Sequence, residues 1–148
     1  MTRATLLAFL RGHRLAVETS VASGGGVQAA VVGIAVIDNF ELVFDTLETT
    51  RKARNIALDP RVAFVIGGTV DGEAVTVQYE GVADRPSGEE MKTLQQRYLE
   101  VFPDGAERLS WPGLIYVRVK PRWLRYSDYG GEPPIILEWS ERDLEALV

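Results

Sequence analysis

The segment "LVFDTLETTRKARNIALDPRVAFVIG", from Leu42 to Gly67, decides the fold of this chain. It reads as an apolar strand, two threonines, a helix of about two turns spanning residues 51–58, and a second apolar strand. Ala53, Ile56 and Ala57 have the spacing of a buried helix face. The sequence "DPR" ends the helix, because the residue before a proline disfavours helical backbone. The pattern predicts a short helix inserted between two strands.

Two cations stand at the start of this helix. Thr49 and Thr50 occupy the positions expected for its N-cap, and Arg51 and Lys52 fall in its first turn. A helix N-terminus already carries partial positive charge and unpaired N–H groups, so each added cation costs up to about 1 kcal/mol unless an anion is bound. Amides, hydroxyls, a guanidinium and an ammonium at one point are typical of a phosphate site.

An alternative reading of the same cations involves no ligand. Arg51 and Lys52 could extend into water or form ion pairs with Asp45 and Glu48, as most surface charges do. The segment alone leaves both readings open.

Four further segments have strand patterns. Residues 15–21 and 74–84 alternate between apolar and polar side chains, which predicts strands with one buried face. Residues 27–38 form an apolar run that predicts a strand buried on both faces. Residues 114–128 predict a long last strand, in which Pro121 indicates an edge or a bulge.

The remaining elements are helical or irregular. "SGEE" predicts a capping box between Ser87 and Glu90 that opens an amphipathic helix ending at Pro103. Residues 129–148 are expected to form a looser C-terminal tail that ends in a short capped helix from Ser140.

The order of these elements predicts the fold class. Hairpin-type turns between most strands favour antiparallel pairing over the alternating pattern of a parallel sheet. We therefore predict a single domain, residues 1–148, of mainly β class: a small antiparallel barrel of about six strands with short helices between them.

Composition narrows the possible functions. The net charge of −5 disfavours nucleic acid as a partner. The absence of cysteine and the presence of one histidine, His13, argue against a metal site. The short apolar N-terminal stretch is interrupted by charged residues, so we expect neither a membrane segment nor a signal peptide, and a cytoplasmic location.

Taken as a whole, the segment from Leu42 to Gly67, followed by the strand "VQYEGVAD", resembles the pyridoxamine 5'-phosphate oxidase-like family of FMN-binding split barrels. The family hallmark is a strand, a hydroxyl residue, Arg-Lys on a short helix, and Asn-Pro or Asp-Pro before the next strand. The resemblance covers roughly residues 15–128 and implies an antiparallel split barrel that binds FMN as a homodimer.

The resemblance also implies roles for particular residues. Arg51 and Lys52 would hold the FMN phosphate, with Thr50 as hydroxyl donor. The remaining cofactor-binding candidates come from the neighbouring strands. They are the main chain of Asp45 and Thr46 along the flavin, Gln28 beside the ring and ribityl chain, Thr76 and Gln78 reaching the cofactor from the second subunit, and Trp123 and Arg125 on the last strand.

The chain departs from the family's vitamin B6 oxidase. That enzyme needs an Arg-x-His-x-Arg stretch near its C-terminus, whereas this chain reads "PRWLRYSDYGGEPP" there, without histidine. We therefore expect a different activity. No general acid or base stands out, and the catalytic residues are left unassigned, since a flavin supplies the redox chemistry itself.

Three hypotheses remain. The first is a homodimeric FMN-dependent oxidoreductase of unknown substrate. The second keeps the barrel but binds a deazaflavin, or heme, for which His13 is a poor axial ligand. The third is a binding or stress-related module that holds a flavin without turnover.

Overall fold

The computed structural model describes the whole chain, residues 1–148. Its strands are β1 (Leu15–Val21), β2 (Val27–Gly33), β3 (Ala35–Val36), β4 (Leu42–Leu47), β5 (Arg61–Gly67), β6 (Val75–Asp84), β7 (Leu114–Asp128) and β8 (Ile135–Ser140). Its helices are α1 (Arg3–Arg11), α2 (Arg51–Leu58), α3 (Gly88–Val101), the 3-10 helix η1 (Pro103–Ser110) and α4 (Glu141–Ala146).

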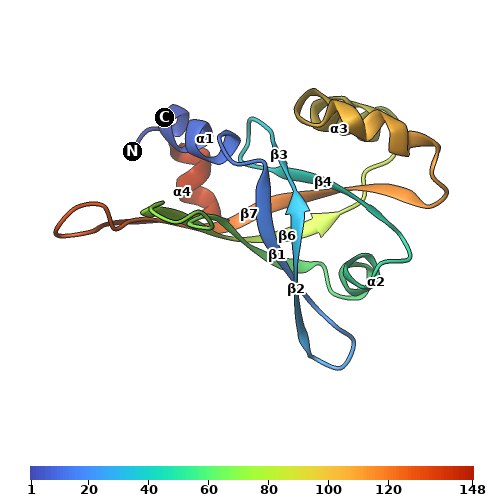
Figure 1. Ribbon diagram of the computed structural model, residues 1–148, viewed down its shortest axis with the longest axis horizontal. Coiled ribbons are helices and arrows are strands. Elements are labelled where there is room, and N and C mark those ends of the chain that lie inside the picture. The colour runs from blue at the N-terminus through green and yellow to red at the C-terminus, as the bar shows by residue number, and fades with distance from the viewer.

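All strands belong to one antiparallel sheet. Its order is β2-β1-β5-β6-β7-β4-β3, with β8 also paired to β7. The sheet is strongly curved into a half-barrel, with one concave and one convex face (Figure 1). This confirms the predicted antiparallel split barrel. It has eight strands, because the run 27–38 divides at Ile34 into β2 and β3 and because the tail contributes β8.

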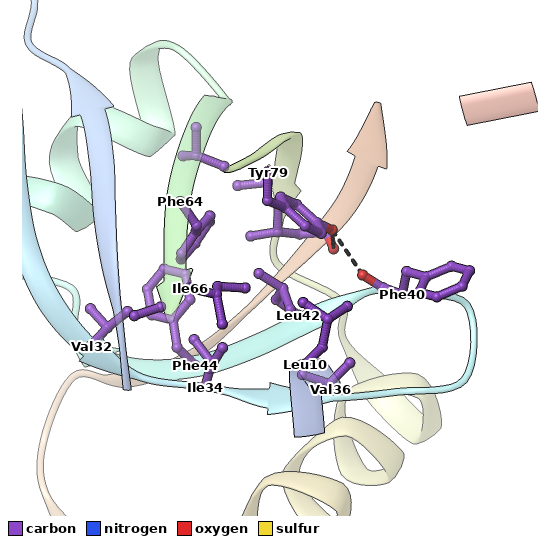
Figure 2. Close-up of a cluster of buried hydrophobic side chains, with 14 of the residues drawn as sticks. Leu10, Val32, Ile34, Val36, Phe40, Leu42, Phe44, Phe64, Ile66 and Tyr79 are labelled. Atoms are coloured by element: carbon purple, nitrogen blue, oxygen red, sulfur yellow. Dashed lines mark hydrogen bonds between the residues drawn. The ribbon is translucent and has the colours of Figure 1, made fainter. Parts of the chain in front are cut away.

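The concave side of the sheet holds the main core. Aromatic and aliphatic side chains from α1 and from most strands meet there (Figure 2). Tyr79 is fully buried among them, and its hydroxyl lies 3.0 Å from the carbonyl of Phe40 and 3.1 Å from that of Val119. This phenol therefore ties β6 to β7 and to the turn before β4.

Strand β7 bends where it carries Pro121. Glu80 of β6 pairs with Trp123, but the next residue, Gly81, pairs with Pro121, so that Arg122 is the extra residue of a bulge. The bend brings Gly81 so close to β7 that an added Cβ would lie 2.5 Å from a side-chain carbon of Val119. The bulge predicted from Pro121 is confirmed.

Strand β2 contradicts the expectation of a strand buried on both faces. It is an edge strand paired only with β1, and Val27 and Val31 are exposed on its outer face. A run of apolar residues predicts that both faces of a strand are covered, but it does not reveal whether the covering residues belong to the same chain. Here one face of the run points away from the protomer.

Two expectations about the later part of the chain were also wrong. Ser87 makes no side-chain hydrogen bond to the start of α3, and the Glu90 carboxylate, the other half of the predicted capping box, pairs with the buried guanidinium of Arg118, which also binds Asp84. The tail is ordered by its pairing, since β8 extends the sheet along the end of β7. The capped helix after Ser140 is confirmed as α4, with Asp143 completing the capping box.

The helices cover different parts of the sheet. Helices α1 and α4 lie together near the two termini, and α3 lies against the β4 region (Figure 1). Helix α2 lies apart from these three helices and contacts β1. None of the helices combines the length and the apolar run that a membrane crossing requires.

Removing the Tyr79 hydroxyl should destabilise the fold. Tyr79→Phe leaves two buried carbonyls without this donor, and we expect a loss of about 1–2 kcal/mol in the free energy of unfolding. Urea denaturation measures this change. The matched control is Tyr129→Phe, at a residue that is 60% exposed, and it should behave as wild type. An unchanged unfolding midpoint for Tyr79→Phe would contradict the role assigned to this hydroxyl.

Candidate functional site

The start of α2 is fixed by the predicted N-cap, Thr50. Its side-chain oxygen accepts a hydrogen bond from the N–H of Ala53 at 3.3 Å and donates one to the carbonyl of Leu47 at 2.9 Å. The hydroxyl of Thr46, at the end of β4, lies 3.0 Å from it. The end of β4 and the first turn of α2 are thereby held together.

Arg51 and Lys52 project from this first turn. Arg51 is exposed and makes no hydrogen bond or ion pair. Lys52 is half-buried, and its ammonium donates to Thr46 Oγ1 at 3.4 Å. Because the first N–H groups of a helix lack partners within it, these two side chains stand beside unpaired donors. The arrangement suits an anion with several acceptor oxygens.

The alternative pairing of these cations with Asp45 or Glu48 does not occur. Asp45 accepts a hydrogen bond from the Nε of Arg108 and another from the hydroxyl of Tyr98, each at 2.9 Å. Burial and the nearby Asp45 carboxylate raise the pKa of Tyr98. The Asp45 side chain thus points toward α3 and η1, and the exposed Glu48 forms no ion pair.

A second polar group lies beneath α2. The side-chain amide of Asn55 donates to Gln28 Oε1 at 2.8 Å and to Ser20 Oγ at 3.2 Å, joining α2 to β1 and β2. Asn55 is buried, whereas Ala57, which the helical spacing placed inward, is exposed. The predicted site residue Gln28 therefore lies on the same side of the sheet as α2.

Glu18 is the residue that sequence reasoning missed. Its side chain is 1% exposed, on the concave face of β1 between Ala16 and Ser20. Its Oε1 has no hydrogen-bond partner. Burial raises the pKa of Glu18 to about 7, although the Lys52 ammonium and the Ser20 hydroxyl lower it in part. The strand alternation carried the only signal, because it placed Glu18 on the opposite face from Val17.

The four other predicted site residues lie on the convex face of the sheet. Gln78 pairs across the strands with Arg125, which itself forms an ion pair with Glu138 at 3.3 Å. Thr76 and Trp123 are on the same face of β6 and β7, since they are two residues from this pair. A single protomer therefore does not bring these four together with Arg51 and Lys52.

The convex face is apolar over β2, β1 and β5. Cross-strand pairing aligns Val31, Val17 and Val65 in one row and Ala29, Thr19 and Ala63 in the next. Val31 is 66% exposed and Val65 41% exposed. No group of three or more histidine or carboxylate side chains is arranged to hold a metal ion.

Comparisons with known proteins agree with this architecture. The family model described as pyridoxamine 5'-phosphate oxidase matches residues 2–128. No curated protein matches the sequence.

Several solved structures share the fold at low sequence identity. A heme binding protein from Mycobacterium smegmatis superposes with a TM-score of 0.82 at 19% identity, over 98% of this chain and 59% of that chain. The chain thus spans about three-fifths of that relative's length. A putative pyridoxamine 5'-phosphate oxidase from Listeria innocua has a TM-score of 0.70 at 20% identity, over 84% of this chain and 96% of that one. A pyridoxamine 5'-phosphate oxidase-related, FMN binding protein from Nostoc punctiforme has a TM-score of 0.68 at 15% identity, over 93% and 87%.

The buried Glu18 should make stability depend on pH. Its pKa in the folded protein, about 7, lies above the ordinary value of 4.5, so the folded state binds more protons and loses stability as pH rises between these values. Glu18→Gln removes the titration. We expect little change near pH 4.5 and a gain of about 3 kcal/mol near pH 8, measured by urea denaturation.

The control for this measurement is Glu48→Gln, which removes an exposed carboxylate close to the same helix. It should follow the wild-type pH profile. A stability difference between Glu18→Gln and wild type that is the same at every pH would contradict the assignment of a raised pKa to Glu18.

Proposed function

The chain belongs to the pyridoxamine 5'-phosphate oxidase-like family, and on that premise we propose that it is an FMN-binding protein that acts as a flavin-dependent oxidoreductase. The observation that carries the proposal is the start of α2. There Arg51 and Lys52 offer an unpaired guanidinium and an ammonium next to the free amides of the first helical turn, whose start is fixed by the Thr50 hydroxyl.

These residues fit a phosphate monoester. A phosphate presents three acceptor oxygens and about two negative charges near neutral pH, which matches two cations and several N–H donors. Arg51 would bind through its forked guanidinium, and Lys52 would contribute a point charge from the side of Thr46. Gln28 and Asn55 supply further polar atoms on the side of α2 that faces the sheet.

A complete site would need a second copy of the chain. Thr76, Gln78, Trp123 and Arg125 lie on the convex face, which is also the face with the apolar rows of β2, β1 and β5. Pairing two protomers through these rows would bury Val31 and Val65 and would present the convex side chains of each protomer to its partner. Two equivalent sites would follow from the two-fold symmetry.

FMN supplies the redox chemistry when it is bound, and the residues of this chain hold and orient it. The basic groups fix the phosphate end, the polar pair Gln28 and Asn55 lies beside the helix, and Trp123 offers an aromatic surface from β7. The substrate would be a small molecule that enters from the convex side. A deazaflavin, whose phosphate could use the same cations, is the alternative cofactor.

Heme is less compatible with this chain. The chain has one histidine, His13. Its Nδ1 lies 2.8 Å from the carbonyl of Phe9, and its Nε2 lies 2.5 Å from a carboxylate oxygen of Glu73. Both ring nitrogens are engaged, so His13 does not present a free nitrogen to an iron.

Removing the two cations should abolish FMN binding. Each charge-assisted hydrogen bond contributes about 1.5–3 kcal/mol, so Arg51→Ala with Lys52→Ala should weaken binding at least about 100-fold. The measurement is quenching of FMN fluorescence on titration with protein. Arg54→Ala, an exposed arginine one turn further along α2, is the matched control and should bind as wild type. Affinity of the double variant within threefold of wild type would refute the phosphate site.

A charge on the convex face should dissociate the dimer. Val31→Glu places a carboxylate at the exposed β2 end of the apolar row, and we expect the mass in sedimentation equilibrium to fall to that of one chain, with weaker FMN binding. Val70→Glu, at a position 69% exposed in the loop before β6, is the control and should stay dimeric. A wild-type protein that sediments as a single chain would contradict this part of the proposal.

A further inference from the structure

Glu18 is a carboxylate placed where a phosphate site should not have one. It is on the concave face of β1, beneath α2, and it lies within electrostatic range of Lys52. Its side chain is almost completely buried, and its Oε1 has no hydrogen-bond partner. A buried and incompletely bonded carboxylate is costly to keep, so its position requires an explanation.

The surroundings of Glu18 contain one charged group. Its neighbours across the sheet are Ala30 of β2 and Phe64 of β5, and both are uncharged. Helix α2 contributes Lys52, and β1 itself contributes the Ser20 hydroxyl. The charge state of Glu18 and the charge that Lys52 offers to a ligand are therefore coupled directly.

We propose that Glu18 is a positioning residue that couples phosphate binding to uptake of a proton. When its carboxylate is ionised, it offsets the charge of Lys52 and repels an incoming phosphate. When it is protonated, the full charge of Lys52 is available to the phosphate. The inference rests on the proposed FMN site and specifies how that site is regulated.

The proton balance follows from this arrangement. The site with Glu18 ionised, a phosphate dianion and one proton from solvent combine to give the complex with Glu18 protonated. Because burial places the pKa of Glu18 at about 7 before the ligand binds, and a nearby dianion raises it further, uptake occurs mainly above pH 7. In that range the phosphate is already a dianion, since its second pKa is about 6. The second ionisation of the phosphate then contributes little to the number of protons taken up.

The test is calorimetric titration of the purified dimer with FMN between about pH 7 and pH 8.5. For wild type we expect affinity to fall about tenfold across this range. Glu18→Gln keeps the shape of the side chain but cannot ionise, so its affinity should stay constant and should equal or exceed that of wild type at the upper pH. Glu48→Gln should reproduce the wild-type slope.

A second readout uses wild-type protein alone. Titrations near pH 8 in two buffers of different ionisation enthalpy should reveal uptake of more than about half a proton per FMN. A purely structural role for Glu18 would not produce this uptake. Equal pH slopes for wild type and Glu18→Gln, or no proton uptake, would overturn the coupling while leaving the FMN site intact. Absence of FMN binding at every pH would overturn the proposed function and this inference together.

Discussion

The candidate site depends on the short turn between β4 and α2. The hydroxyl of Thr50 caps the helix, bonds back to the carbonyl of Leu47 and meets the hydroxyl of Thr46, whose oxygen also accepts from Lys52. These contacts fix where the helix begins and, with it, the direction of its unpaired N–H groups. They also orient Lys52, whereas Arg51 is left free. The site therefore combines one cation that is hydrogen-bonded to the protein with one that has no partner in the protein.

The two sides of helix α2 have different structural roles. Its outer side presents cations to solvent. Its inner side packs Ala53 and Ile56 into the hydrophobic core and also rests, through Asn55, on a polar layer of the Gln28 and Ser20 side chains. Such a layer orients the helix through specific hydrogen bonds, at the cost of burying polar atoms. Glu18 lies beside this layer, and its buried Oε1 has no hydrogen-bond partner.

Local signals account for what the sequence predicted correctly. The start of α2 and the capped helix α4 follow from side chains that hydrogen-bond within a few residues of themselves, and the bulge in β7 follows from Pro121, which has no N–H to donate to the strand pairing. The predictions were wrong where the environment of a residue depends on partners that are distant in the sequence. Glu90 is drawn away from Ser87 by Arg118, and the exposure of β2 depends on which strands lie beside it. The burial of Glu18 depends likewise on α2 packing over β1. Whether the predicted convex residues meet the cofactor depends on a second chain, which no single sequence pattern describes.

The long strand β7 has a consequence for the order of folding. It pairs with β4 through residues 114–119, with β6 through residues 118–128 and with β8 through residues 123–128. Until Leu114–Asp128 has left the ribosome, both β4 and β6 have an open edge and the sheet remains in two separate parts. Closure therefore waits for contacts between residues far apart in sequence, which is typical of slowly folding β proteins. During synthesis the exposed edges are the segments most in need of protection from association with other chains.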